Sequence, residues 1–273
     1  MVIPSEARDR SRRAAIALDD SRLFDTWDRA AALARPWREL ALLEGASGIP
    51  VDELACLTIG ERDRLLLAVR IGTFGNRLEC ETRCPSCETR LELSFDAASL
   101  MVPSKPVNDD DLELTIDERT VRFRLPDSND VAAALSGEDI ASRLVIPSPS
   151  SVIPRRDSEA RDHSLGQAVE PPRHESDPSS PSRLGMTQAR IAERIAELDP
   201  QADIFLDLNC GACGHRWQSP FDPAAFLFRE LEAHVARLTS EVHVLARAYA
   251  WSEESILAMG ATRRRRYLNL VLQ

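Results

Sequence analysis

Apolar residues recur at three- and four-residue intervals in several stretches of the chain, which is the spacing of one helix face. The longest stretch follows Asp222 and Pro223, a suitable N-cap and first helical residue, and runs to about Tyr249. Its apolar positions are Phe226, Leu227, Leu231, Val235, Leu238, Val242, Leu245 and Ala246. Similar spacing predicts helices over residues 23–44 with a break at Pro36, 61–71, 131–135, 186–198, 256–259 and 261–272. The pattern therefore predicts a mainly helical chain.

Thr58 and Glu61 mark the start of the helix over 61–71. A hydroxyl and a carboxylate three residues apart form a capping box, in which the two side chains accept hydrogen bonds from backbone N–H groups of the first turn. Gly72 and Gly75 follow the last apolar turn, and either can end the helix in a C-cap.

Apolar residues that recur at every second position predict strands in three places. Two alternating stretches, residues 77–96 and 203–221, each surround a Cys-x-x-Cys turn and are predicted to form β-hairpins. The runs at 112–116 and 121–125 predict a third hairpin, with its turn at 117–119. Together with the helices, these hairpins indicate an α+β fold.

The two Cys-x-x-Cys turns belong to one repeated pattern, C-x2-C-x3-(Leu/Trp)-x3-Phe-Asp, with identical offsets in both copies. Its cysteines are Cys84, Cys87, Cys210 and Cys213. Four thiolates supply a closed tetrahedral zinc site, and such a site is structural because it leaves no position for water or substrate. The pattern predicts that the two distant hairpins share one structural Zn²⁺ and form a zinc ribbon.

The competing interpretations are redox dithiols and disulfides. Six cysteines in 273 residues do not resemble a small disulfide scaffold. Residues 1–20 show no signal-peptide pattern, and no stretch is apolar enough to span a membrane, so we expect a reducing, cytoplasmic location.

Cys80 is not expected to be a ligand, because its counterpart in the second copy is Leu206. Cys56 is likewise predicted to be a packing residue, and His215 a turn residue.

The chain divides into four parts by composition. Residues 1–20 are predicted to be flexible, and residues 21–146 hold the first helices, the first ribbon hairpin and the third hairpin. Residues 147–183 are predicted to be a disordered linker, since they contain seven of the seventeen prolines, nine serines and no aromatic residue. Residues 184–273 hold the second ribbon hairpin and the C-terminal helices. We expect 21–146 and 184–273 to form one folded unit, because closing a long loop costs little more than closing a short one.

The net charge of −10 and the 5% aromatic content argue against nucleic-acid binding, which zinc ribbons otherwise suggest. The exception is the run Arg263–Arg266, which we interpret as a solvated cationic stretch that complements a helix dipole or an acidic protein surface.

None of the common catalytic motifs is found, and the five histidines lack a catalytic or metal-binding spacing. We therefore expect no enzymatic activity. His234 and His243 are expected on the polar face of the long helix.

Two further stretches carry a resemblance. The first is Leu57–Leu67 followed by Phe74–Glu79 and the first cysteine pair; the second is Cys210–Trp217 followed by Phe226–Leu231 and Ala246–Tyr249. Over most of residues 50–140 and 185–270 the chain resembles the baseplate-protein family of contractile phage tails and phage-tail-like injection systems. The resemblance implies a baseplate or hub component, or an assembly chaperone. It also implies other baseplate, hub and spike proteins as partners, with no small-molecule substrate. The alternative is a zinc-ribbon nucleic-acid-binding or regulatory protein.

Overall fold

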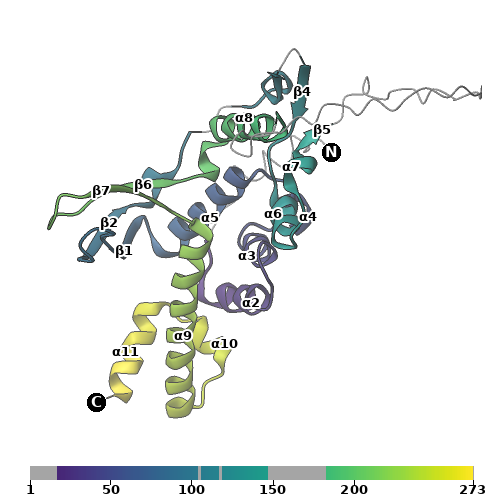
Figure 1. Ribbon diagram of the computed structural model, residues 1–273. Helices are drawn as coiled ribbons and strands as arrows, with labels where there is room; N and C mark the ends of the chain where they lie inside the picture. The colour runs from purple at the N-terminus through teal and green to yellow at the C-terminus, as the bar shows by residue number, and fades with distance from the viewer. Residues whose placement is uncertain (1–16, 104–105, 117–118, 147–182, 273) are drawn as a thin grey trace, which may run out of the picture.

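A computed structural model describes residues 17–103, 106–116, 119–146 and 183–272 of the protein, and helices predominate in them (Figure 1). The helices are α2 (Asp20–Ala31), α3 (Trp37–Ser47), α4 (Val51–Ala55), α5 (Ile59–Phe74), α6 (Ser128–Leu135), α7 (Ile140–Leu144), α8 (Arg183–Leu198), α9 (Pro223–Tyr249), α10 (Glu253–Leu257) and α11 (Ala261–Val271). The strands are β1 (Arg77–Arg83), β2 (Arg90–Asp96), β3 (Glu113–Ile116), β4 (Arg119–Phe123), β5 (Val145–Ile146), β6 (Phe205–Asn209) and β7 (Arg216–Pro220). Short 3-10 turns are η1 (Ala97–Leu100), η2 (Asp109–Leu112) and η4 (Pro200–Ala202).

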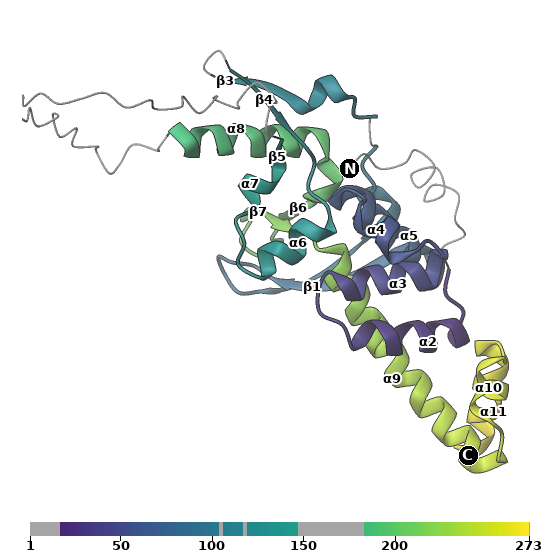
Figure 2. The ribbon, with the colours of Figure 1, turned by 90° about the vertical axis from the view of Figure 1, so that its right-hand side faces the viewer.

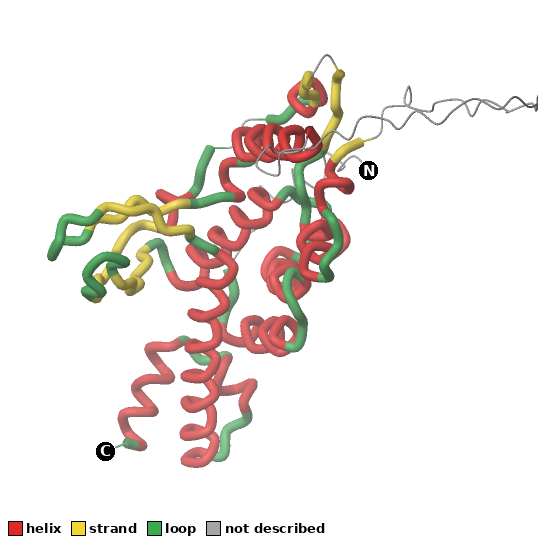
Figure 3. The backbone as a smooth tube through the Cα atoms, in the orientation of Figure 1, coloured by secondary structure: helices red, strands yellow, loops and turns green. Residues whose placement is uncertain are grey.

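The strands form three small antiparallel sheets: β1–β2, β3–β4–β5 and β6–β7. The prediction of an α+β fold with two separate cysteine hairpins is confirmed. The hairpins project from the same side of the helical body (Figure 3). The predicted linker, residues 147–183, lies outside the described residues except for its last residue.

Helix α9 runs along the molecule and organises its core (Figures 1 and 2). Its first turns contribute Leu227, Phe228 and Leu231 to a large cluster built mainly from α2, α3, α4 and α5. Farther along, Leu238 and Leu245 are fully buried, whereas Val242 is half-buried. The apolar stripe predicted for this helix is therefore the face that packs. Asp222 caps the helix through Ala225 N–H, as its position before Pro223 predicted.

The predicted capping box at Thr58 and Glu61 is present at the start of α5. A third residue completes this helix end from the other half of the chain. Asp199 Oδ2 accepts a hydrogen bond from Gly60 N–H at 2.8 Å, and its side chain is buried. A Cβ at position 60 would overlap the Asp199 carboxylate, so only glycine fits there.

Gly60→Ala is expected to lower the free energy of unfolding by about 1–3 kcal/mol, the usual cost of an added methyl group in a packed site. Chemical unfolding in urea measures the change. Gly260→Ala is the matched control, because position 260 has a negative φ and no atom within 4 Å of the added Cβ. Position 260 is the N-cap of α11, where glycine is preferred over alanine, so the control is expected to cost less than about 1 kcal/mol. Equal effects of the two substitutions would contradict the close approach of Asp199.

The two halves of the chain are joined by further contacts beside Gly60. Gln201 is buried, donates to Leu100 O at 3.2 Å and accepts from Val102 N–H at 2.6 Å. Both hydrophobic clusters also combine side chains from before and after the undescribed segment. That residues 21–146 and 184–273 form one folded unit stays a prediction.

The flexible N-terminus predicted over 1–20 lies mostly outside the described residues, but Leu18 is buried and Asp19 caps α2, so order begins before residue 21.

The interpretation of Arg263–Arg266 as a solvated cationic stretch is wrong for one of its members. Arg264 is only 2% exposed and lies between two carboxylates, with Nη2 2.6 Å from Asp20 Oδ2 and Nε 2.7 Å from Glu241 Oε2. It also donates to Met259 O at 2.8 Å. Four consecutive helical residues point in all directions, so one of them must face α9. The run also lies in the first half of α11, where it does not complement the helix dipole.

His234 also differs from its prediction as a polar-face residue. It is half-buried, and its Nε2 lies 3.1 Å from Asp20 Oδ1. The ring meets Phe74 edge-on, with 5.3 Å between centroids. His243 is exposed, as predicted.

Candidate metal centre

Two hairpins that lie far apart in sequence have the same local structure. In the first, Cys84 N–H donates to Thr89 O at 3.0 Å, and Glu88 N–H donates to Cys84 O at 2.9 Å. The second repeats both bonds at the same offsets, from Cys210 N–H to His215 O at 2.9 Å and from Gly214 N–H to Cys210 O at 2.8 Å. The repeated sequence pattern therefore folds into a repeated turn.

The residue after each cysteine pair has a left-handed backbone, with φ 59° at Glu88 and 74° at Gly214. Glycine adopts this conformation readily. Glutamate rarely does, so the residue type gave no indication of it at Glu88. The internal repeat contained the missing signal, since Glu88 aligns with Gly214.

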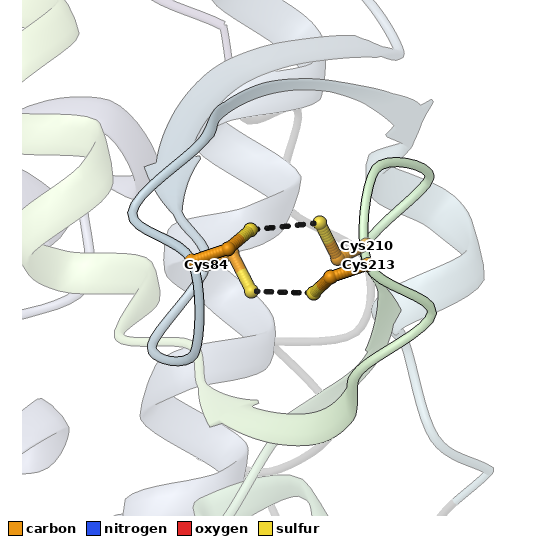
Figure 4. A group of neighbouring side chains, drawn as sticks. Cys84, Cys210 and Cys213 are labelled. Carbon is orange, nitrogen blue, oxygen red and sulfur yellow. Dashed lines mark hydrogen bonds between the residues drawn. The ribbon is translucent and has the colours of Figure 1, made fainter.

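The four sulfur atoms converge between the two turns (Figure 4). Cys84 Sγ lies 3.7 Å from Cys213 Sγ, and Cys87 Sγ lies 3.6 Å from Cys210 Sγ. All four ligand atoms lie within 4.8 Å of one another. A tetrahedral ion with metal–sulfur bonds of about 2.3 Å requires sulfur–sulfur distances of about 3.8 Å. The donor set and its spacing therefore fit one tetrahedral metal ion.

Burial follows the repeat as well. Cys84 and Cys210, the first cysteine of each pair, are buried, whereas Cys87 and Cys213 are exposed. His215 does not join the group of potential ligands; it is exposed, and its ring stacks on Trp217 with 5.8 Å between centroids.

Without a cation, the ionisation of one thiol affects the ionisation of the other three. Hydrogen bonding by the side chain and backbone of Thr89 lowers the pKa of Cys87 to about 6. The backbone of His215 favours the Cys213 thiolate, but the other three sulfurs and partial desolvation raise the pKa of Cys213 to about 11. Sulfurs this close cannot all ionise unless a positive charge lies among them. A bound divalent cation would supply that charge.

A small apolar cluster joins the bases of the two hairpins. It contains Leu67, Leu78, Ala97, Leu100, Ile204 and Phe226. Phe95 and Phe221 pack against this cluster, and the centroids of their two rings lie 6.1 Å apart. Cys80 lies half-buried against this cluster, where burial raises the pKa of its thiol. It is therefore absent from the group of four sulfurs, as its alignment with Leu206 predicted.

No strand pairing connects the two hairpins within the described residues, since β1–β2 and β6–β7 are separate sheets. The hairpins meet at the apolar cluster near their bases and at the sulfurs near their tips. At the tips, the contacts between the hairpins are those between the cysteine sulfurs of the described residues, Cys84 with Cys213 and Cys87 with Cys210.

The family model described as T4 bacteriophage base plate protein matches residues 44–152. This match confirms the resemblance to baseplate proteins, and it includes α5 and the first cysteine pair but not the second pair or α9. The resemblance over residues 185–270 stays a prediction. Comparison with curated proteins gave no match. Comparison with solved structures gave none either. None of the described helices has the length and hydropathy of a membrane span.

Proposed function

Because residues 44–152 match the T4 base plate family, we propose that this protein is a structural or assembly component of the baseplate of a contractile phage tail or phage-tail-like injection system. The family match carries the proposal. Its partners are then other baseplate, hub or spike proteins, and its place is the tail particle or the cytoplasm in which that particle is assembled.

The proposal includes a structural zinc ion held by Cys84, Cys87, Cys210 and Cys213. Zinc is the metal that four-cysteine tetrahedral sites most often bind in a reducing environment. The sulfur spacing supports it. With all four ligand positions taken by protein, the ion has no open position for a substrate, which is the reason to propose a non-enzymatic role.

The zinc would act as the connection between the hairpin tips. The apolar cluster holds the hairpin bases, but the tips contribute mainly exposed or half-buried residues. A metal ion there would add a connection between the tips to the contacts that already join the second half of the chain to the half that matches the baseplate family.

Deleting the gene is expected to abolish normal sheathed particles, as seen by electron microscopy of the tails. Wild-type protein supplied in trans should restore them. Mass spectrometry of purified particles then separates a resident component, which is found in the particle, from an assembly chaperone, which is not. Normal contractile particles in the deletion strain would argue against any baseplate role.

A further inference from the structure

Helix α11 carries a positively charged outer surface on an acidic protein. Arg263, Arg265 and Arg266 are exposed, and none of them forms an ion pair with a described residue. We call these three residues the basic face. Leu270 of the same helix and Leu272, directly after its last residue, are 63% and 75% exposed. Unpaired cations beside exposed leucines have the composition of a protein contact surface.

The basic face is held in a fixed orientation. Between its members, the buried Arg264 ties α11 to Asp20 of α2 and Glu241 of α9. The ring of Tyr267 packs edge-on against two others. Its centroid lies 5.8 Å from that of Tyr249 and 4.9 Å from that of Trp251. The exposed arginines are therefore presented by a helix that is anchored on its opposite side.

A matching acidic surface lies at the other end of the molecule. Asp109 and Asp110 of η2 are exposed and form no ion pair with a described residue, whereas their neighbours Asp111 and Glu113 are paired with Arg194 and Arg122. We call Asp109 and Asp110 the acidic end. Val107 and Leu112 are half-buried in the same segment and add apolar surface. Figure 2 shows β3 and α11 at opposite ends of the molecule.

We propose that the basic face of one copy binds the acidic end of a second copy, so that the protein self-associates head to tail. The two surfaces cannot meet within one chain, because they lie at opposite ends. Their charges are complementary, and each surface offers apolar side chains beside its charges. A contact between two different surfaces of identical chains repeats from copy to copy and yields a ring or a filament. The inference does not depend on the baseplate proposal, since it rests on surface charge alone.

Sedimentation velocity of the full chain tests the proposal. The wild-type mass is expected to rise with protein concentration and to fall toward the monomer between about 50 mM and about 500 mM NaCl, because salt screens exposed charges. Arg265→Glu/Arg266→Glu and, separately, Asp109→Lys/Asp110→Lys are each expected to weaken association at least about tenfold. The control Arg77→Glu/Arg216→Glu makes the same charge change at exposed hairpin residues and should leave association unchanged.

Mixing two neutral variants gives the sharpest result. Arg265→Gln/Arg266→Gln and Asp109→Asn/Asp110→Asn each keep one intact surface and create no new pair of opposite charges, so their equimolar mixture should form a one-to-one complex and nothing larger. Circular dichroism checks that both variants are folded. A wild-type chain that stays monomeric at low salt would overturn the proposal, as would a mixture that stays monomeric. Loss of single-stranded DNA binding in the arginine variant, with a monomeric wild type, would assign the basic face to nucleic acid instead.

Discussion

Cys84→Ser/Cys210→Ser is expected to remove the proposed zinc ion and to separate the tips of the two hairpins. Structural zinc contributes on the order of 10–16 kcal/mol of apparent binding free energy in zinc-finger peptides. The effect here should be smaller but still several kcal/mol, because the apolar cluster at the hairpin bases remains. Zinc content by elemental analysis should fall from one ion per chain to none. Amide exchange in β1, β2, β6 and β7 should accelerate before exchange in α3 and α5.

Cys80→Ser and Cys56→Ser are the matched controls. Both residues are half-buried cysteines outside the group of four sulfurs, so each variant should retain one zinc per chain. A strong chelator added to the wild type should reproduce the serine variant. Full zinc retention after loss of Cys84 and Cys210, or loss of zinc from the Cys80 variant, would contradict the four-cysteine assignment.

Arg264→Ala is expected to lower the free energy of unfolding by about 3–5 kcal/mol, the range for removing one partner of a buried ion pair. The substitution leaves Asp20 and Glu241 facing each other with side chains only 22% and 20% exposed. Urea unfolding measures the loss, and limited proteolysis should cut first near α11. Arg265→Ala, the exposed neighbour, should cost less than about 0.5 kcal/mol in dilute protein. Similar costs at both positions would contradict the burial of Arg264.

The same network predicts that the free energy of unfolding depends on pH in the acidic range. A hydrogen bond with His234, reinforced by Arg264, lowers the pKa of Asp20 to about 2 despite the opposing effect of burial. An unfolded aspartate titrates near about 3.9. The stabilisation by Asp20 is therefore complete above about pH 4 and is lost as the pH falls from about 4 to about 2. Asp20→Asn should remove this part of the acid-induced loss; an unchanged acid profile would contradict the role of Asp20.

Local signals in the sequence predicted local structure well. The capping box at Thr58 and the cap at Asp222 needed only neighbouring residues to form, and both are present. The cysteine repeat likewise predicted which four sulfurs meet, because each hairpin places its own pair and the shared offsets exclude Cys80. That repeat was the only feature of the sequence which indicated that the two hairpins lie together.

Contacts between distant segments were not predictable in this way. The carboxylate of Asp199 over Gly60 and the amide of Gln201 between Leu100 and Val102 depend on where η4 packs, and no spacing rule records that. The buried Arg264 was missed for a related reason. Four consecutive arginines suggest solvent exposure, and only the packing of α11 on α9 decides which one lies inside.

The length of α9 has a mechanical consequence. At 1.5 Å per residue its 27 residues extend for about 40 Å, from the end of β7 to the turn before α10. A rotation of about 5° at the hairpin end would shift the far end of such a rigid rod by about 3.5 Å, roughly the width of one atom. The first turns of this helix are packed into the core, and its far half carries α11. A small change in how those first turns pack would therefore become a measurable displacement at α11.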